Sequence, residues 1–539
     1  MEPIEEATPI DEEPPEEPTE PPVEPDVEYE PVPPVEIITT TEAYDPIRYE
    51  AGFIIQDAWE QLGLEVIVRP MEFATALERF YDEQDFDATI LGWSGRVERL
   101  DPQHFLSTLY TGQTDLGGNN PGGYSNPEYD RLFEAQGREF DVDARLDMVL
   151  EMQDIYKSDA PTIVLFYRDE VVAYNDDTFD NYVIMAGEGL YNEWTPMQVN
   201  PLTDEMMLTI GAPQEPDTIN PLDSTSVWGW KWLRMYYDKL VRLSADVEPV
   251  PWAAEEIIPV DDTTIDVVLR QGMLWHDGEP VTVEDVKFTF DYFNEQDFAY
   301  FRSFYGPIDN VQILDENTVR FNLEEAFAPF ITVTLSQIPL LPMHIWEGIE
   351  VAADLAPADI PTVGSGPFIF DRYDRGEYMS LRTNPDHFAA DDIQIEGVEF
   401  IIYADAEGVF TGLLTAEIDM TAWRLEPAQI PLAEQEDNLT IVSVPDFGYY
   451  HLTYNLRREP FDDVAMRRAL TYALDRERMV NVLLDGRGEV GSSVIAPINA
   501  FWHNPFIERF EFDLDLARQE LIDAGYIWDD DGKLLRPVR

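Results

Sequence analysis

Apolar residues near the start of the globular part of the chain follow two spacings. Short apolar runs at 36–41, 64–71 and 86–95 predict three strands. Between them, apolar residues recur at helical spacing over 46–62 and 73–84. The order strand, helix, strand, helix, strand predicts an α/β fold with a mostly parallel sheet. In such sheets ligands bind beyond the carboxyl ends of the strands, so the loop after the third strand is a candidate ligand contact.

The middle of the chain is less regular. A long helix is predicted near 141–158, and the segment 160–175, "APTIVLFYRDEVVAYN", predicts two short strands or one bent strand. The stretch 190–207 has no clear periodicity and contains Pro196 and Pro201, so we interpret it as a connector.

From residue 208 onward the two spacings alternate over longer stretches. The aromatic segment 227–243 predicts a helix. Thr282 is placed to cap another helix, with Asp285 three residues further on. The remaining expected elements are a hairpin at 311–323, strands at 366–371, 377–383 and 396–403, a strand pair at 441–456, and helices at 464–484 and 513–524.

The first 36 residues differ from the rest in composition. They contain fourteen acidic residues, no basic residue and a dense set of prolines. Such a segment buries too little apolar surface to offset the entropy of ordering it. We therefore expect an acidic, Pro-rich disordered tail over 1–36, either simply solvated or serving for docking or cation binding.

Charge and composition exclude several classes of partner and chemistry. The 108 acidic residues against 34 basic ones give a net charge of −74, which repels nucleic acid and anionic membranes. The sequence contains no cysteine, so thiolate catalysis and cysteine-based metal sites are excluded. No apolar run is long enough to span a membrane, and the N-terminus lacks the basic and apolar regions of a signal peptide.

The sequence contains no motif that indicates catalysis or a cofactor. A nucleophile elbow, a zinc-protease helix, a phosphate-binding loop and a dinucleotide fingerprint are all missing. The six histidines are scattered, and none pairs with another at helical spacing. We therefore expect no catalytic residue, no metal and no cofactor. What recurs instead is aromatic residues in glycine-containing loops, which suit either an apolar ligand pocket or ordinary packing.

Several long segments resemble one known family. They are "WHDGEPVTVEDVKFTFDYF", "LPMHIWE", "VGSGPF", "AEIDM", "YYHLTYNLRREPFDDVAMRRALTYALDRERMV" and "GYSNPEYDRL". Together they make the chain similar to the extracytoplasmic solute-binding proteins of peptide-type ABC transporters, the dipeptide/oligopeptide-binding family 5. The resemblance implies a two-lobed periplasmic-binding-protein-like fold of class II, peptide-binding type.

The order of the segments departs from the family. The stretch "LTIGAPQEPDTINPLDS" at 208–224 resembles the family's first strand and ligand loop, and the part resembling the family's end stands in front of it. We expect a circularly permuted chain, or alternatively one period of a tandem array. The expected parts are the tail at 1–36, lobe II at 37–170 and 441–539, a return into lobe I with a connector at 171–206, and lobe I at 207–440 with an extra subdomain at about 241–359.

The resemblance also implies a function. Such a protein captures a peptide or peptide-like solute between its lobes, closes by hinge motion and delivers the solute to the transmembrane subunits of an ABC permease. We expect an extracytoplasmic monomer that is not an enzyme. A binding or sensor module for an organic anion or a glycoside, or an engineered permutant, is the alternative. The implied solute contacts are Trp228, Trp230, Gly364, Ser365, Gly366 and Trp423 from lobe I, and Trp93, Ser94, Arg96, Tyr449, Tyr450 and Trp502 from lobe II.

One position departs from the pattern of the peptide binders. The family typically places an aspartate after Gly-Trp-x-Gly to hold the amino terminus of the peptide, but here that position is Arg96. An arginine favours a carboxylate or another acceptor, unless it turns outward and pairs with Glu98. Dipeptides are therefore one candidate solute beside modified peptides, organic anions and glycosides.

Overall fold

The structure, a computed structural model, describes most of residues 27–538. The gaps within that range are 96–98, 217, 225–226, 297, 299–300, 302–304, 350–351, 353–354 and 357. Residues 1–26 of the expected tail lie outside the described residues. The prediction of a disordered tail is wrong for its last part, because β1 (Tyr29–Pro31) pairs with β23 (Leu534–Pro537), and β2 (Val35–Thr40) begins at the buried Val35. The opposite end of the sequence supplies the partner strand.

The first strands form the predicted parallel arrangement. β2 lies between β3 (Val66–Met71) and β4 (Ala88–Trp93), and pairs with both in parallel. Helix α1 (Pro46–Glu60) begins as predicted, with Pro46 in its first turn and Asp45 as its N-cap. The helix expected at 73–84 is confirmed in part, as α2 (Phe73–Leu77) followed by a π-helical turn over Glu78–Asp82.

The C-terminal part of the chain completes this half of the molecule. Strand β20 (Tyr449–Tyr454) pairs antiparallel with β4, and the Trp59 indole of α1 donates to the carbonyl of Leu470, 411 residues away, on α13 (Val464–Tyr472). One core contains buried residues from 32–90, 163–166 and 450–534. We call this half lobe II.

The other half, lobe I, has a larger core whose buried residues all fall between 172 and 422. Its sheet runs in the order β15 (Phe368–Asp374), β16 (Tyr378–Thr383), β17 (Gly397–Ile402), β8 (Met207–Ala212) and β18 (Met420–Thr421). β8 is parallel to both neighbours. The helix expected over 227–243 ends early, as α7 (Val227–Tyr236), because Val241–Leu243 form the short strand β9 and pair with β10 (Pro249–Pro251).

A separate antiparallel sheet extends lobe I. Its order is β11 (Ala254–Asp261), β12 (Thr264–Leu269), β14 (Thr318–Leu323) and β13 (Ile308–Ile313), so the predicted hairpin is confirmed. Helix α8 (Val283–Gln296) begins with the predicted cap, in which the Asp285 carboxylate accepts from the Thr282 backbone at 2.8 Å.

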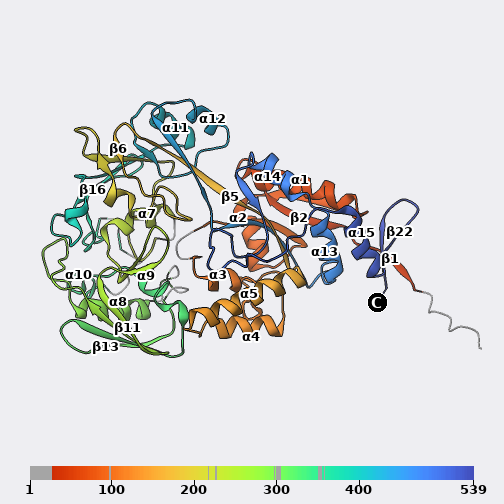
Figure 1. Cartoon of the computed structure of the whole chain (residues 1–539), viewed down its shortest axis with the longest axis horizontal. Coiled ribbons are helices and arrows are strands. Elements are labelled where there is room, and N and C mark those ends of the chain that lie inside the picture. Colours follow the sequence, from red (N-terminus) through yellow and green to blue (C-terminus); the bar gives the residue numbers. More distant parts are fainter. Residues whose placement is uncertain are drawn as a thin grey trace, which may run out of the picture.

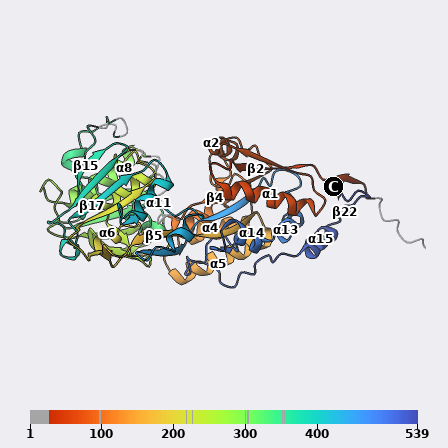
Figure 2. The same cartoon turned by 90° about the horizontal axis from the view of Figure 1, so that it is seen from above.

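Strand β5 (Thr162–Asn175) belongs to both lobes. The segment 160–175, predicted as two short strands or one bent strand, therefore forms one long strand. Its first half pairs with β20 and β21 (Gly488–Val490), and its second half pairs with β18 and β19 (Leu439–Pro445). The predicted strands at 441–456 are therefore β19 and β20, which lie in different lobes. Figures 1 and 2 show β5 in the waist between the two halves.

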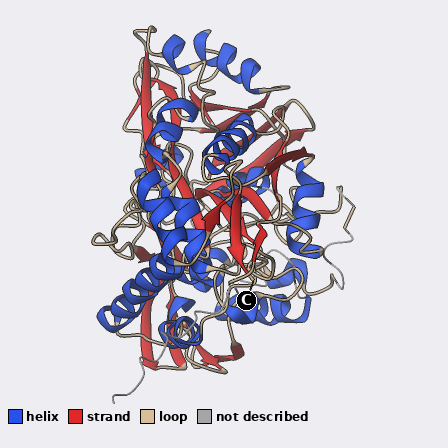
Figure 3. Cartoon of the chain, turned by 90° about the vertical axis from the view of Figure 1, so that its right-hand side faces the viewer, coloured by secondary structure: helices blue, strands red, loops and turns tan. Residues whose placement is uncertain are grey.

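The remaining helices surround these sheets (Figure 3). They are α3 (Pro102–Ser107), α4 (Pro127–Gln136), α5 (Val142–Asp159), α6 (Thr195–Gln198), α9 (Thr334–Gln337), α10 (Met343–Trp346), α11 (Ala406–Leu414), α12 (Ile430–Ala433), α14 (Arg476–Leu483) and α15 (Leu514–Asp523). Three short strands complete the list: β6 (Phe179–Asp180), β7 (Asn200–Pro201) and β22 (Ile527–Trp528).

Candidate functional site

Two of the predicted aromatic residues meet at the end of β4. Trp93 is opposite Tyr449 in the β4–β20 ladder, and the Phe105 ring lies near both, with centroid distances of 6.4 and 5.2 Å. Arg99 lies over the Trp93 ring and donates to the Ser94 carbonyl and hydroxyl oxygens at 2.6 and 3.1 Å. Trp93 and Tyr449 line a cavity of about 20 Å³ inside lobe II. A cavity needs roughly 10–15 Å³ to hold one water, so this space admits little more.

A second pair of predicted residues stacks in lobe I. Trp228 on α7 and Trp423, just after β18, have ring centroids 5.1 Å apart. Trp228 is buried, whereas Trp423 is only half-buried and carries the Arg424 guanidinium 5.0 Å from its ring centroid. Trp423 is therefore partly accessible and has a cation against its ring.

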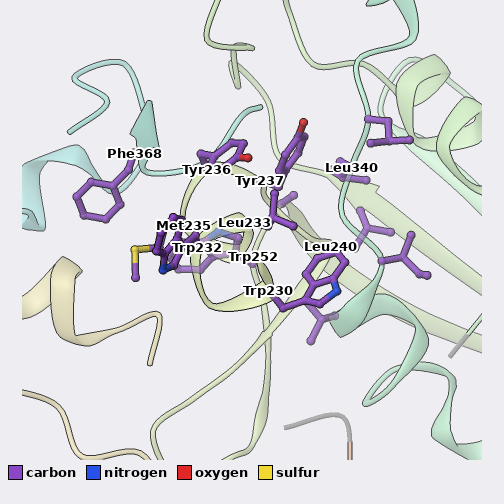
Figure 4. Close-up of a cluster of buried hydrophobic side chains, with 14 of the residues drawn as sticks. Trp230, Trp232, Leu233, Met235, Tyr236, Tyr237, Leu240, Trp252, Leu340 and Phe368 are labelled. Atoms are coloured by element: carbon purple, nitrogen blue, oxygen red, sulfur yellow. The ribbon is translucent and has the colours of Figure 1, made fainter. Parts of the chain in front are cut away.

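Trp230 and the Gly-Ser-Gly loop lie inside lobe I. The Trp230 indole donates to the Ser224 carbonyl at 2.9 Å, and its ring centroid lies 5.0 Å from that of Phe301. Figure 4 draws Trp230 among the buried side chains of the lobe I core. A Cβ on Gly364 or Gly366 would overlap the backbone of α7 at Tyr236, so the loop packs against that helix end. Ser365 is 1% exposed. Trp230 and Ser365 are thus both buried inside lobe I.

Trp502 packs beside a buried ion pair. The Arg145 guanidinium lies 4.8 Å from the centroid of the Trp502 ring and holds both oxygens of Asp101, at 2.9 and 2.7 Å. Asp101 also caps α3 through the Gln103 backbone at 2.9 Å. Asp101 thus holds Arg145 and the start of α3 within lobe II, and it also accepts from the Thr332 hydroxyl of lobe I at 3.3 Å. Arg96 lies outside the described residues.

Tyr450 contacts residues at the boundary between the two lobes. Its hydroxyl donates to Asp45 at 3.0 Å and accepts from Arg168 at 3.2 Å. Asp45 follows β2 at the start of α1, and Arg168 lies in β5 where the chain crosses between the lobes. The hydroxyl therefore connects the carboxyl end of the parallel sheet to the crossing strand.

A pocket opens beside this connection. Its volume is about 130 Å³, and the side chains come from both lobes. We call it the hinge pocket. It is lined by Tyr44, Asp45, Pro46 and Ile47, by Arg168, Asp169 and Val171, by Arg424, Leu425, Glu426, Pro427 and Ile430, and by Leu483, Leu484, Asp485 and Arg487.

The charged residues of the hinge pocket were not among the predicted site residues. Asp45 directly before Pro46 was a readable helix-start signal at the carboxyl end of a predicted strand. Arg424 directly follows the predicted Trp423, but an isolated arginine in a loop carries no signal of burial. Arg168 was hidden inside a long strand whose crossing point the sequence did not specify.

The second crossing between the lobes also carries a buried acid. Asp446 lies in the turn between β19 and β20 and accepts from the backbone of Gly448 at 2.9 Å. Burial and the nearby Glu170 raise the pKa of Asp446 to about 6, against the opposing effects of Arg168 and of backbone donors. A Cβ on Gly95 would overlap this carboxylate, so the loop after β4 packs directly on the turn.

Two further observations concern metal binding and membrane insertion. Within the ranges that the structure describes, no three histidine, aspartate or glutamate side chains gather as metal ligands. In the same part of the chain, no helix is both long enough and apolar enough to cross a bilayer.

The known proteins that this chain resembles are solute-binding and peptide-binding proteins. The family model of the bacterial extracellular solute-binding proteins, family 5 Middle, matches residues 248–538. The oligopeptide-binding protein AppA of Bacillus subtilis is 30% identical over 341 residues, which cover 60% of this chain and 62% of that protein. The dipeptide-binding protein of Escherichia coli is 26% identical over 311 residues, which cover 54% and 57%.

The solved structure of the ABC transporter substrate-binding protein CtaP from Listeria monocytogenes has a TM-score of 0.52 and 26% identity, with 60% of this chain and 66% of that chain covered. The chain spans about three fifths of the length of the curated relatives it matches. The match to the family model nevertheless covers more than half of the 539 residues of this chain. The chain belongs to the bacterial extracellular solute-binding proteins of family 5.

Proposed function

We propose that this chain is the solute-binding component of an ABC importer. It captures a peptide or peptide-like solute between its lobes, closes about the crossing strands and presents the closed form to a permease outside the cytoplasm. The observation that carries the proposal is the pair of crossings. Within the described residues, the chain passes between the two cores only in β5 and in the turn from β19 to β20. Two adjacent strands of this kind act as a hinge.

Contacts between the lobes support closure. The Ala328 backbone donates to the Gly137 carbonyl at 2.8 Å, and the Thr332 hydroxyl donates to Asp101 at 3.3 Å. Arg138 and Glu325 form an ion pair at 2.8 Å. All three contacts join lobe I to lobe II, near α3 and α4 in Figure 1. They are of the kind that forms when the lobes come together.

Calorimetry against a panel of peptides of two to nine residues, with sugars and organic acids beside them, tests this function. We expect stoichiometric binding of at least one peptide and recovery of the ligand unchanged. The relatives named above are binding proteins rather than enzymes, which supports a function without catalysis. Conversion of any ligand to a product, or binding of sugars alone, would contradict the proposal.

We also propose that the segment order is permuted relative to the family, with residues 37–200 corresponding to the family's last part. The Val538 backbone donates to the Glu28 carbonyl at 2.9 Å, so these two residues lie side by side. A variant that runs from 207 to 538, continues through a linker of about four residues to 28 and ends at 206 tests the order. We expect it to fold with unchanged ligand affinity. Failure of this variant alone to fold would contradict the permutation.

A further inference from the structure

One segment of the chain has the three-residue pattern of an N-linked glycosylation acceptor. The pattern is an asparagine, any residue except proline, and then a serine or a threonine. Asn438, Leu439 and Thr440 fit it, and no other asparagine in the sequence does. Because the pattern is short, it indicates an acceptor only where the fold leaves the asparagine within reach at the surface.

The structure places these residues in a surface turn of lobe I. The turn follows α12 and leads into β19, which begins at Leu439. The four residues before Asn438, from 434 to 437, are all exposed. Figure 1 shows α12 at the upper edge of the molecule. A surface loop of this kind can accommodate a bulky sugar chain.

The fold does not use the side chain of Asn438. This side chain is half-buried, and within the described residues no hydrogen bond reaches its amide group. The backbone is held instead, because the Asn438 carbonyl accepts from the Asp176 backbone at 3.1 Å. A side-chain amide that the fold needs is normally hydrogen-bonded, so this amide can be modified without the loss of a bond within the protein.

The other two residues of the pattern anchor the turn. Leu439 packs in an apolar cluster of lobe I that also contains Ile430 and Ala433 of α12. The Thr440 hydroxyl donates to the Asp176 carboxylate at 2.8 Å. This hydrogen bond is exposed and therefore competes with water, so the hydroxyl can also serve another acceptor.

The turn lies away from the crossings between the lobes. Leu439 pairs with Asn175 at one end of the β5–β19 ladder, and Pro445 pairs with Asp169 at the other end. At roughly 3.3 Å per residue, the turn is about 20 Å from the crossing along the strand. A sugar chain on Asn438 therefore starts far from the strands that join the lobes.

We infer that Asn438 is the acceptor of an N-linked oligosaccharide. The inference rests on the proposed function in one respect, because the transfer takes place outside the cytoplasm. The Asn438 amide nitrogen attacks the anomeric carbon of a polyprenyl-diphosphate-linked oligosaccharide. A carbon–nitrogen bond forms, the bond from that carbon to the diphosphate oxygen breaks, one amide proton passes to a base of the transferase, and polyprenyl diphosphate leaves. A membrane-bound oligosaccharyltransferase catalyses this step and requires the Thr440 hydroxyl.

Export of the full chain past such an enzyme tests the inference. The chain is produced behind an export signal in cells that contain an oligosaccharyltransferase and its lipid-linked donor. A C-terminal tag, Glu-Asp-Asn-Leu-Thr, repeats residues 436–440 and reports that the enzyme has met the chain. Intact mass and peptide mapping should show an oligosaccharide on the tag and another on Asn438. The second should be lost in Asn438→Gln and in Thr440→Ala and kept in Thr440→Ser.

Two matched controls separate the three-residue pattern from the local fold. Asp176→Ala removes the same hydrogen bond as Thr440→Ala but keeps the pattern, so Asn438 should still be modified. Asn322 is also followed by a leucine, but Glu324 stands in place of the threonine, so Asn322 should stay unmodified. An unmodified Asn438 would overturn the inference, whether or not the tag is modified. Modification of Asn438 in Thr440→Ala would overturn it as well.

Calorimetry with peptides on the same preparations keeps the two proposals apart. Peptide binding by a chain that is unmodified at Asn438 would leave the proposed function standing and overturn the acceptor site. A chain that carries the oligosaccharide but binds no peptide would leave the acceptor site standing and contradict the proposed function.

Discussion

The two lobes are built from the chain in different ways. Lobe I is formed by one continuous stretch, and its β8 lies between strands that follow it in sequence. Lobe II joins residues 32–90 to residues 450–534, so its core depends on contacts across hundreds of residues. Such contacts are costly to form because a long loop of chain must be closed. The two lobes, although similar in kind, therefore need not be equally stable.

Removing one large buried ring from each lobe should have the largest effect and tests whether the two lobes unfold separately. Trp59→Ala deletes a fully buried indole and its bond to Leu470, and should lower the stability of lobe II by about 3–5 kcal/mol. Trp232→Ala is the control, since Trp232 is 1% exposed in lobe I and stacks on Phe400. Thermal unfolding followed by hydrogen exchange should show the first variant losing lobe II alone. Simultaneous loss of both lobes would show that they fold as one unit.

The unmodified protein gives a second test. We expect the amides of lobe II to exchange before those of lobe I under native conditions, because its two halves meet only through long-range contacts. Hydrogen exchange read by mass spectrometry compares peptides from β2 and β20 with peptides from β8 and β17. Earlier opening of lobe I would refute the inference from chain order.

The free energy of unfolding should depend on pH through Asp446, in the turn where the chain crosses between the lobes. Its native pKa of about 6 lies above the ordinary 3.8, so the native state binds this proton more tightly than the unfolded state does. The contribution therefore favours folding at low pH and is lost as the pH rises through about 4 to 6, by at most about 3 kcal/mol. Asp446→Asn should remove this part of the pH dependence and stabilise the protein above pH 6. Denaturant unfolding at several pH values measures it, and an unchanged profile would contradict it.

The smallest effect is expected from the exposed contact between the lobes. Glu325→Gln removes the ion pair with Arg138, and both side chains are more than half exposed, so stability should change by less than about 1 kcal/mol. Closure should nevertheless weaken slightly, seen as a small loss of ligand affinity that high salt reproduces in the wild type. A loss larger than tenfold would mean that this contact is a main determinant of closure.

Much of the fold could be predicted, because in these segments the sequence pattern favours the same helices and strands that the tertiary packing requires. Asp45 and Pro46 start α1, Thr282 and Asp285 start α8, and the parallel order of β2, β3 and β4 follows from alternating elements. The family resemblance supplied the expectation of two lobes. In these segments each residue type suits both its local conformation and its packing.

The segment 190–207 shows where pattern fails. It has no period, yet Leu190 and Val199 are fully buried in the core of lobe I. Side-chain bonds hold it, because the Asn192 amide donates to the carbonyls of Val183 and Gly189 at 2.8 Å and accepts from the Thr195 backbone at 3.0 Å. A chain held by such bonds needs no hydrophobic period to be buried.

The candidate site was predictable only in part for a similar reason. Trp93, Trp423 and Tyr450 could be found in the sequence as aromatic residues in loops or at strand ends. An aromatic residue in such a place can line a pocket or pack in a core, and the sequence does not say which. Trp230, for example, lies in the core of lobe I. Arg424 was not predicted, because its place on the Trp423 ring and in the lining of the hinge pocket is a property of the three-dimensional fold.

Strand β5 gives the molecule a mechanical character as well. A force that pulls the lobes apart passes through β5 and through the link from β19 to β20, two segments that run in opposite directions. Their hydrogen bonds to neighbouring strands are loaded along the strand axis, in shear, rather than opened one at a time. Stretching the joint along the strands would therefore have to break several of these hydrogen bonds together, which opposes separation of the lobes.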